Sequence, residues 1–367
     1  MIRLGDVATY INGYAFKPKD RGKVGLPIIR IQDLTGNAYN LGFYDGEYPK
    51  KIEINDGDVL ISWSASLGIY VWNRGKALLN QHIFKVAFDK VEIDKKYFVY
   101  AVRHKLAEMG MKTHGATMKH IVKKDFDAIQ IPYPSLKEQM KIANNLDKIS
   151  KVIEDRKTEI MLLDNLIKAR FVEMFGDCGN MVSLNDLCLI ITDGTHQPPK
   201  FQETGIPFIL VSNLSNNTVT YNTVKYVSEE TYDELYKRTP IELGDLLLST
   251  VGSYGHPAVV TEDIRFLFQR HIAYLKPKRE LVNSFYLHSA LLASDGQRQI
   301  EEKVKGIAQK TLNLSEIRKI MIPFPKLEEQ NAFAAFVHHV DKSKVAVQKS
   351  LDETKLLFDS LMQQYFG

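Results

Sequence analysis

The stretches "IPYPSLKEQ" at residues 131–139 and "IPFPKLEEQ" at residues 322–330 are identical at six of nine positions. In each stretch, two prolines hold the chain extended and exclude a helix before them. Ser135 and Glu138 have the spacing of a capping box, which predicts that a helix begins here. The second stretch has Lys326 in place of the serine, which predicts a less well defined helix start. Each stretch therefore marks a joint between an extended segment and a helix.

The rest of the chain is also repeated, with its blocks in the same order in both copies. The matching blocks are "LGDVATYING" (4–13) with "LNDLCLIITDG" (184–194), "GLPIIRIQDL" (25–34) with "GIPFILVSNL" (205–214), "INDGDVLISWSASLG" (54–68) with "IELGDLLLSTVGSYG" (241–255), "NQHI" (80–83) with "QRHI" (269–272), and "GATMKHI" (115–121) with "GIAQKTL" (306–312). A repeat of about 180 residues has the size of a domain rather than of a solenoid unit. The sequence therefore predicts a tandem duplication.

Each copy has two parts. The first part contains short β-branched runs bounded by turns, and a helix is expected at residues 97–109 in one copy and 284–297 in the other. The second part contains no Pro or Gly over about 40 residues, which predicts one long helix. We therefore expect an α+β fold. Its predicted parts are two similar globular domains at residues 1–131 and 176–322, and two long helices within residues 132–175 and 323–367.

The apolar residues of both long helices follow alternating steps of four and three, which is the spacing of a coiled-coil seam. The two seams differ, because Lys344 stands in the second copy where Ile153 stands in the first. Unequal seams favour pairing of the two helices within one chain, and the alternative is that each helix packs on its own globular part. Paired helices would hold the two similar globular parts at a fixed separation. Such an arrangement indicates a bipartite linear target, such as DNA. The residues expected to pair are Ile142, Leu146, Ile149, Ile153, Ile160, Leu163, Ile167, Phe333, Val337, Val340, Val347, Leu351, Phe358 and Leu361.

The composition excludes some classes of protein but does not identify one. A formal net charge of +4 and a pI of about 8.7 permit a nucleic-acid partner but do not require one. With 44% hydrophobic residues in 367, the chain can bury cores, which excludes general disorder. The two cysteines lack disulfide or zinc spacing and favour a reducing, cytoplasmic setting. No secretory signal is expected, and no apolar run reaches about 18 residues, the length that spans a membrane.

Catalytic signatures are missing from the sequence. It contains no G-x-x-x-x-G-K-[ST] phosphate loop, no G-x-G-x-x-G loop and no Asn/Asp-Pro-Pro-aromatic motif of an amino-methyltransferase. His82 and His271 occupy matching positions, but no carboxylate or nucleophile accompanies both, so a hydrogen-bonding role is favoured. We therefore expect a chain that is not an enzyme and that binds neither a metal nor a cofactor.

Candidate DNA-contacting residues lie in loops that are basic or rich in hydroxyl groups. Lys and Arg bind phosphates, whereas Arg, Asn, Gln, Ser and Thr read base edges. A single basic loop is more often ordinary surface, but the two copies share a framework and differ in these loops, as two readers of different sequences would. The candidates are Lys17, Lys19, Arg21, Lys23, Ser62, Ser64, Lys112, Thr113, His114, Lys119, His196, Lys200, Ser253, Tyr254, His256, Arg270, Lys305 and Lys310.

Taken together, the doubled Ile-Pro-x-Pro-x-Leu-x-Glu-Gln stretch, the "GATMKHI" and "GIAQKTL" blocks and the "GDVLIS" and "GDLLLS" runs resemble the specificity subunit of type I restriction–modification systems. The resemblance implies two target-recognition domains that each read half of a split DNA sequence. It also implies an antiparallel coiled coil that sets the gap between the half-sites, and a subunit without catalytic residues.

The implied partners are double-stranded DNA, two modification subunits that methylate adenine, and restriction subunits in the full complex. S-adenosylmethionine, ATP and Mg²⁺ would then be bound by those partners, in the cytoplasm of a prokaryotic cell, as part of host defence. Two alternatives remain open at this point: an enzyme with cryptic motifs, and a scaffold whose globular parts bind proteins. Salt-dependent, sequence-selective DNA binding would distinguish the DNA reader from a scaffold.

Overall fold

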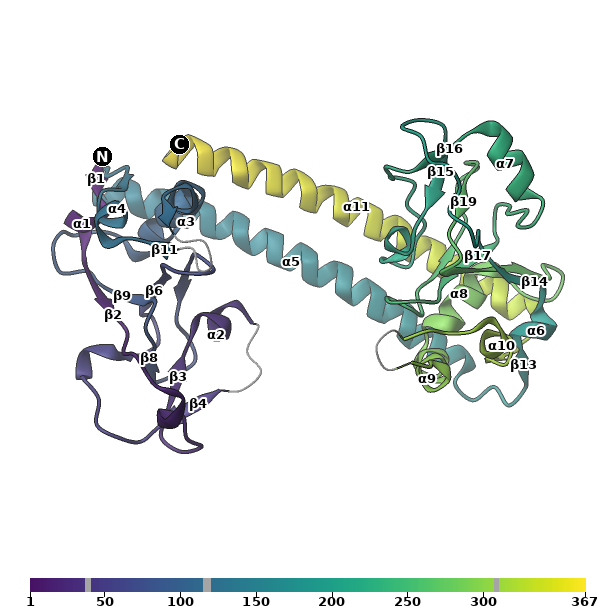
Figure 1. The fold of residues 1–367 in the computed structure, drawn as a ribbon, viewed down its shortest axis with the longest axis horizontal. Helices are drawn as coiled ribbons and strands as arrows, with labels where there is room; N and C mark the ends of the chain where they lie inside the picture. The colour runs from purple at the N-terminus through teal and green to yellow at the C-terminus, as the bar shows by residue number, and fades with distance from the viewer. Residues whose placement is uncertain (37–40, 115–119, 307–309) are drawn as a thin grey trace. The chain divides into compact units, whose positions relative to one another are not determined.

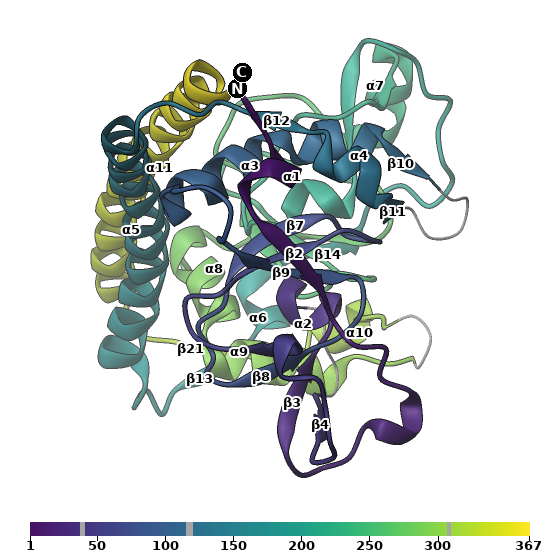
Figure 2. The same cartoon turned by 90° about the vertical axis from the view of Figure 1, so that its left-hand side faces the viewer.

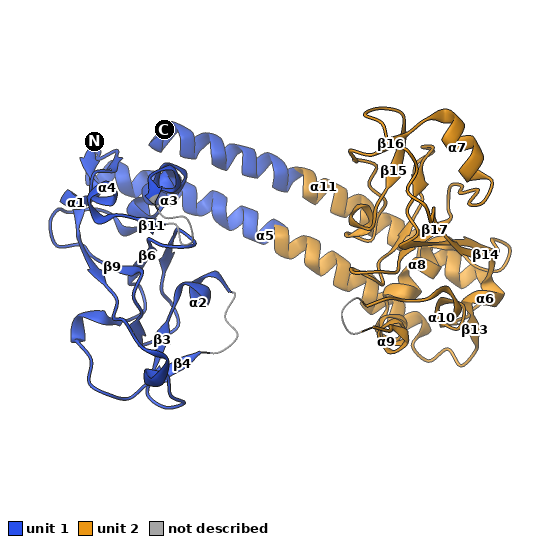
Figure 3. Cartoon of the chain, in the orientation of Figure 1, with its two compact units in different colours: residues 1–156, 350–367 blue, residues 157–349 orange. Residues whose placement is uncertain are grey.

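The computed structural model describes residues 1–36, 41–114, 120–306 and 310–367, and the chain divides into two compact units (Figure 3). The first unit comprises Met1–Arg156 and Ser350–Gly367, and the second comprises Lys157–Lys349. Each unit contains one globular part and one segment of each of two long helices. No helix in the described ranges has both the length and the apolar character needed to cross a membrane.

The two long helices, α5 (Leu136–Phe175) and α11 (Leu327–Phe366), contain 40 residues each. As predicted, α5 begins directly after Ser135, whose hydroxyl lies 3.4 Å from the main-chain nitrogen of Glu138. The start of α11 is equally well defined, contrary to the expectation from Lys326. The Glu329 carboxylate accepts a hydrogen bond from the main-chain N–H of Lys326 at 3.0 Å, which is the half of a capping box that does not require a serine.

In the first unit, the segments of α5 and α11 lie side by side and run in opposite directions (Figures 1 and 2). Ile142 and Leu146, near the start of α5, belong to the same buried cluster as Met362 and Phe366, near the end of α11. This pairing confirms the predicted antiparallel arrangement within one chain.

In the second unit the same relationship is repeated with the other ends of the helices. Phe171 and Phe175, at the end of α5, pack edge-to-face against Phe333 near the start of α11, with ring centroids 5.5 and 5.6 Å apart. Lys344, the polar residue in the seam, forms an ion pair with Asp164 at 2.6 Å. None of the fourteen residues expected to pair is exposed.

The globular part of the first unit contains four sheets and short helices. The strands are β1 (Ile2–Arg3), β2 (Thr9–Asn12), β3 (Leu26–Ile29), β4 (Gly42–Tyr44), β5 (Glu53–Ile54), β6 (Val59–Ser62), β7 (Gly68–Val71), β8 (Ala77–Leu79), β9 (Ile83–Ala87), β10 (Thr113–His114), β11 (His120–Ile121) and β12 (Gln130–Ile131). The helices are α1 (Leu4–Val7), η1 (Pro18–Asp20), α2 (Ile31–Thr35), η2 (Lys50–Ile52), α3 (Lys95–Met111) and α4 (Lys123–Asp127). The strand orders are β2-β9-β6-β7, β4-β3-β8-β5, β1-β12 and β10-β11. Figures 1 and 2 show α3 beside the long helices.

The globular part of the second unit repeats this plan with an additional helix, α7. Its strands are β13 (Met181–Ser183), β14 (Cys188–Asp193), β15 (Ile206–Ile209), β16 (Tyr226–Val227), β17 (Leu246–Ser249), β18 (Pro257–Val259), β19 (Leu267–Phe268), β20 (Ile272–Pro277) and β21 (Met321–Pro323). Its helices are α6 (Leu184–Leu187), η3 (Val211–Leu214), α7 (Glu229–Tyr236), α8 (Ser284–Leu292), α9 (Ser294–Lys303) and α10 (Leu314–Ile317). The strand orders are β14-β20-β17-β18, β16-β15-β19 and β13-β21.

A central strand in each unit is buried on both faces. In β6, Val59 and Ile61 point into one hydrophobic cluster and Leu60 points into another, because successive side chains of a strand face opposite ways. In β17, Leu246 and Leu247 divide in the same manner between two clusters. In each unit, the four-stranded sheet that contains this central strand therefore separates two hydrophobic cores.

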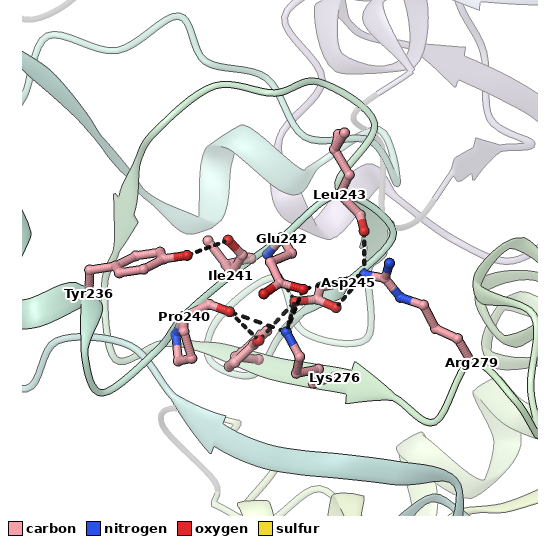
Figure 4. Close-up of polar contacts among 9 residues, drawn as sticks. Tyr236, Pro240, Ile241, Glu242, Leu243, Asp245, Lys276 and Arg279 are labelled. Carbon is pink, nitrogen blue, oxygen red and sulfur yellow. Dashed lines mark hydrogen bonds and ion pairs between the residues drawn. The ribbon is translucent and has the colours of Figure 1, made fainter.

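The predicted Gly-Asp turns precede these central strands, and both glycines have a positive φ of 83–86°. In the second unit, Asp245 is fully buried and accepts hydrogen bonds from the main-chain N–H of Glu242 at 2.9 Å and the hydroxyl of Tyr274 at 2.8 Å. Lys276 and Arg279 both point toward this carboxylate, at 3.5 and 3.3 Å (Figure 4). The carboxylate therefore anchors the turn that starts β17.

Candidate nucleic-acid interface

Two loop segments that are far apart in the sequence meet in the second unit. The turn after β17 lies against residues 310–312, where Leu312 donates its main-chain N–H to the carbonyl of Thr250 at 2.8 Å. Thr250 in turn donates to the carbonyl of His271 at 2.9 Å, and Gly252 donates to the carbonyl of Lys310 at 3.3 Å. These hydrogen bonds join "STVGSYGH", "QRHI" and residues 310–312 around one hollow, which we call the second crevice.

The second crevice has a volume of about 280 Å³ and polar walls. Its lining residues are Asp193, Thr250, Val251, Arg270, His271, Thr311, Leu312, Asn313 and Leu314. Asp193 at its edge pairs with His196 at 2.9 Å and with Arg238 at 2.8 Å. The Asp193 carboxylate is therefore balanced by the guanidinium group of Arg238.

Arg270 is the exposed cation of the second crevice. Its Nε atom donates a hydrogen bond to Nε2 of His271 at 3.3 Å, so the imidazole acts as an acceptor. Burial, and then the charge of Arg270, lower the pKa of His271, which keeps the ring neutral and able to accept. Among the described residues, the two Nη atoms of Arg270 have no partner, so a fork of donors remains for a ligand.

Three further polar residues form a second group next to this crevice. Lys310 lies 3.1 Å from Glu301 and 3.3 Å from the hydroxyl of Tyr254, which itself donates to Glu301 at 2.9 Å. The hydrogen bond from Tyr254, followed by that from Lys310, lowers the pKa of Glu301. Ser253 is exposed on the same turn, and Lys305 lies 3.8 Å from Glu316.

We give the name first crevice to the corresponding edge of the first unit, because the same main-chain hydrogen bonds occur there. Ile121 donates to the carbonyl of Trp63 at 3.0 Å, and Trp63 donates to the carbonyl of His82 at 3.2 Å. These bonds correspond to Leu312 with Thr250 and Thr250 with His271.

The turns that carry Gln81 and Arg270 are also held in the same way. The main-chain N–H of Gln81 donates to Tyr14 at 2.9 Å, and that of Arg270 donates to Thr195 at 3.1 Å. Gly13 packs against this turn so closely that a Cβ atom there would lie 2.0 Å from the carbonyl oxygen of Asn80. The two crevices therefore share a rigid main-chain frame.

The side chains on this frame differ between the two units. Asn12, Trp63 and Gln81 in the first crevice stand where the second has Asp193, Thr250 and Arg270. The indole N–H of Trp63 donates to Asn12 at 3.2 Å, and its ring lies 4.9 Å from that of His82 between centroids. The exposed Gln81 side chain has no hydrogen-bond partner among the described residues.

The basic loop of the first unit lies away from its crevice, beside strand β4. Gly22 pairs with Phe43 through two main-chain hydrogen bonds of 2.8 and 3.1 Å, which attach the loop to the sheet edge. Its four cations are exposed, and no ion pair joins them to any described residue. They are Lys17, Lys19, Arg21 and Lys23.

Several other candidates from the sequence have different surroundings. Ser62 and Ser64 are each 1% exposed, and Ser62 donates to the carbonyl of Ser66 at 2.5 Å, so their side chains are not accessible to a ligand at this surface. Ser62 faces inward because β6 is buried on both sides, and Ser64, beyond the end of β6, pairs with His120 in an isolated bridge. His256 lies 3.0 Å from Asn217 and lines a separate cavity of about 440 Å³. Lys200 is exposed on a loop that is distinct from the crevice.

The remaining candidates belong to the basic loop after α3. Lys112 pairs with Glu108 at 2.7 Å, and Thr113 donates to the carbonyl of Gly110 at 2.7 Å. His114 pairs with His120 through the main chain of β10 and β11, and Lys119 lies outside the described residues.

Sequence reasoning missed Asn12, Trp63 and Gln81 in one unit and Asp193 and Arg238 in the other. Differences between the repeats could have identified some of these residues. The blocks "NQHI" and "QRHI" differ at Gln81, which becomes Arg270 in the second copy. The residue before the matching glycines likewise changes from Asn12 to Asp193. Among the described residues, no group of three or more His, Cys, Asp or Glu side chains is placed to hold a metal ion.

The duplicated frame with divergent side chains agrees with comparisons to known proteins. Residues 1–162 and 180–354 match the family described as the type I restriction modification DNA specificity domain. The chain belongs to this family.

Relatives that match along most of this chain are specificity subunits. It is 25% identical to the type I restriction enzyme EcoBI specificity subunit of Escherichia coli, over 99% of this chain and 83% of that protein. It is 22% identical to the MjaVIII specificity subunit of Methanocaldococcus jannaschii, over 80% of this chain and 74% of that protein.

Two solved structures have a similar fold. The type I S subunit from M. genitalium matches 100% of this chain and 95% of its own, with a TM-score of 0.58 and 16% identity. A chain from a study of assembly and conformational transition of a type I restriction–modification system matches 99% of this chain and 96% of its own, with a TM-score of 0.59 and 18% identity. These structures confirm the predicted fold class.

Proposed function

We propose that this chain is the DNA specificity subunit of a type I restriction–modification enzyme, and that each unit reads one half of a bipartite target. The observation that carries the proposal is the pair of crevices. One main-chain frame occurs twice in a member of this family, and the polar side chains on it change from Gln81 to Arg270 and from Asn12 to Asp193. A shared frame with different polar groups is what two readers of different base sequences require.

We assign recognition of bases to the crevices and binding of phosphates to the basic loops. Arg270 is suited to guanine, whose O6 and N7 atoms accept two hydrogen bonds from one guanidinium group. Gln81 is suited to adenine in the same way. Lys17, Lys19 and Arg21 are suited to phosphate oxygens, since they are exposed and unpaired among the described residues.

The two recognition domains of the proposal are residues 1–131 and 176–322, and the spacer helices lie within residues 132–175 and 323–367. We propose that the helix pair sets the number of base pairs between the half-sites. We also propose that the chain acts without catalytic groups of its own, in the cytoplasm of a prokaryotic cell. Modification subunits would supply adenine methylation, and restriction subunits would supply ATP-dependent cleavage in the full complex. S-adenosylmethionine, ATP and Mg²⁺ would be bound by those subunits.

Sequencing of N6-methyladenine in cells that express the chain with its modification partner tests this function directly. The expected result is one split motif with a constant gap. Methylation without a bipartite motif would contradict the proposal, as would methyl transfer by the chain alone. A binding titration at several salt concentrations adds a second test, because a DNA reader loses affinity as salt rises and a protein scaffold does not bind DNA selectively.

A further inference from the structure

The glutamine of the repeated stretch lies in the first turn of each long helix and is fully buried. In the first unit, Oε1 of Gln139 accepts a hydrogen bond from the main-chain N–H of Asp94 at 3.0 Å. Its Nε2 atom donates to the carbonyl of Pro134 at 2.9 Å. One side chain thereby joins the start of α5 to a residue 45 positions earlier in the chain.

Asp94 is the N-cap of α3, so the contact ties two helix starts together. The Asp94 carboxylate accepts the main-chain N–H of Tyr97 at 2.8 Å, and the Tyr97 hydroxyl donates to the carbonyl of Pro132 at 3.1 Å. Tyr97 is fully buried in the core of the globular part. Gln139 and Tyr97 therefore hydrogen-bond to the two prolines of the "IPYP" segment, Pro134 and Pro132.

The second unit contains the same arrangement at the matching positions. Gln330 accepts the main-chain N–H of Asn283 at 2.9 Å and donates to the carbonyls of Pro325 at 3.0 Å and Leu281 at 3.2 Å. Asn283 is the N-cap of α8, in place of Asp94 for α3. Tyr286 donates to the carbonyl of Pro323 at 2.6 Å, as Tyr97 does to Pro132.

The chemistry of the amide group explains why both copies use glutamine here. The site requires one acceptor for a main-chain N–H group and one donor for a carbonyl, and a neutral amide provides both without a buried charge. An apolar side chain of similar length would leave both main-chain groups buried without partners, which is more costly than the net gain from the original bonds. The helix cap at Ser135 explains where α5 begins, but it does not explain this link to the globular part.

We propose that Gln139 and Gln330 are positioning residues that fix the angle between each globular part and its own helix segments, and thereby keep the gap in the DNA target constant. This inference rests on the proposed function. Successive base pairs are rotated by about 34°, since a turn of B-DNA contains 10–10.5 of them. A globular part that can swivel by about that angle accepts half-sites one base pair closer or further away.

The test compares Gln139→Met and Gln330→Met with the matched control Gln364→Met, which changes an exposed glutamine on α11. Each variant is expressed with the modification partner in cells that carry a plasmid library, in which the two half-sites are separated by the natural gap or by gaps one and two base pairs shorter or longer. The readout is the ratio of methylation at neighbouring gaps to methylation at the natural gap. We expect Gln139→Met and Gln330→Met each to raise this ratio by about three- to tenfold, which corresponds to the net contribution of one hydrogen bond. The control Gln364→Met should leave the ratio unchanged.

Tyr97→Phe and Tyr286→Phe keep the inference testable if a methionine variant fails to fold, because each removes only one hydroxyl group. They should raise the same ratio less than the glutamine variants do. The inference is overturned if all folded variants show the wild-type ratio of methylation at neighbouring gaps to methylation at the natural gap. A lowered melting temperature without a change in this ratio would leave the glutamines with a structural role only. Failure of the proposed function is distinct from this result, because the wild-type chain would then show no bipartite motif.

Discussion

Lys344 on α11 and Asp164 on α5 form an ion pair of 2.6 Å at the seam position where the first copy has Ile153. The two side chains are 29% and 47% exposed, so water screens the pair. An ion pair of this exposure contributes about 0–1 kcal/mol to stability. Its larger effect concerns register, because only one alignment of the helices brings the lysine to the carboxylate.

Substitution of Lys344 separates charge from packing. Lys344→Ile should leave the melting temperature unchanged or raise it, because an apolar residue fits the seam as Ile153 does. Lys344→Asp should lower the melting temperature, because the new carboxylate would lie close to two others. Asp164 is 2.6 Å and Asp341 is 3.6 Å from the lysine that it replaces. Thermal unfolding followed by circular dichroism measures both effects. A larger loss for isoleucine than for aspartate would show that the ion pair, rather than the seam, holds the helices.

The Gly-Asp turns provide a matched pair of stability predictions. Asp245→Ala would remove the buried acceptor of the Glu242 main-chain N–H and of the Tyr274 hydroxyl, and a buried donor left unsatisfied typically costs about 1–3 kcal/mol. Asp58→Ala should cost less, because Asp58 is 23% exposed and pairs with Lys85, which is 20% exposed, at 2.8 Å. Chemical denaturation of the two variants measures the difference. Equal losses would contradict the role assigned to burial.

Arg270 should affect one half of the target only. If its free Nη atoms contact a guanine, Arg270→Ala should weaken binding by about 1–3 kcal/mol at one base pair of one half-site. Gln81→Ala should act in the same way on the other half-site. Arg298→Ala is the control, since Arg298 is an exposed cation on α9 that pairs with Glu302 at 2.7 Å. Competition binding against a target library would reveal the affected base. A uniform loss across all sequences would instead identify Arg270 as a phosphate contact.

His288 predicts a loss of stability in acid. Its Nε2 atom lies 3.0 Å from the carbonyl oxygen of Asn217, which can only accept a hydrogen bond. Burial lowers the pKa of His288 below its ordinary value of about 6.5, so the folded chain binds fewer protons than the unfolded chain in mild acid. The stability associated with the neutral ring is therefore complete above pH 6.5 and declines as the pH falls through the folded pKa.

The measurement for His288 is the difference in melting temperature between pH 7.5 and pH 5.5. The wild-type chain should lose more than His288→Gln, because glutamine cannot take up the proton. An equal loss in both chains would assign the acid sensitivity to other groups, among them His82 and His271, whose pKa values are also lowered by burial.

The long helices and the duplicated plan were predictable because their signals are local. Heptad spacing and the absence of Pro and Gly extend over neighbouring residues, and "IPYPSLKEQ" marks the helix start within nine positions. The predicted helix at residues 284–297 was only partly right, since the chain turns extended at Ala293 and divides α8 from α9. Nothing in the hydrophobic spacing marks that break.

The crevices and the glutamine contacts were not predictable in the same way, because they join residues that are distant in sequence. Gln139 was identified as part of a repeated stretch, but its partner Asp94 lies 45 residues away on another helix. Ser62 and Ser64 illustrate the opposite error. A hydroxyl-rich turn indicates a polar surface, yet Ser62 is the last residue of a strand that is buried on both faces, and Ser64 just beyond it is buried as well.

The frame of the crevices consists of hydrogen bonds between main-chain atoms, such as those of Trp63 with Ile121 and of Thr250 with Leu312. Main-chain bonds do not depend on which side chain a residue carries. The residues that face the ligand can therefore mutate one at a time with little loss of stability, and neither half of the molecule has to change when the other does. A protein built in this way can diversify its preferences quickly under selection while its architecture is conserved.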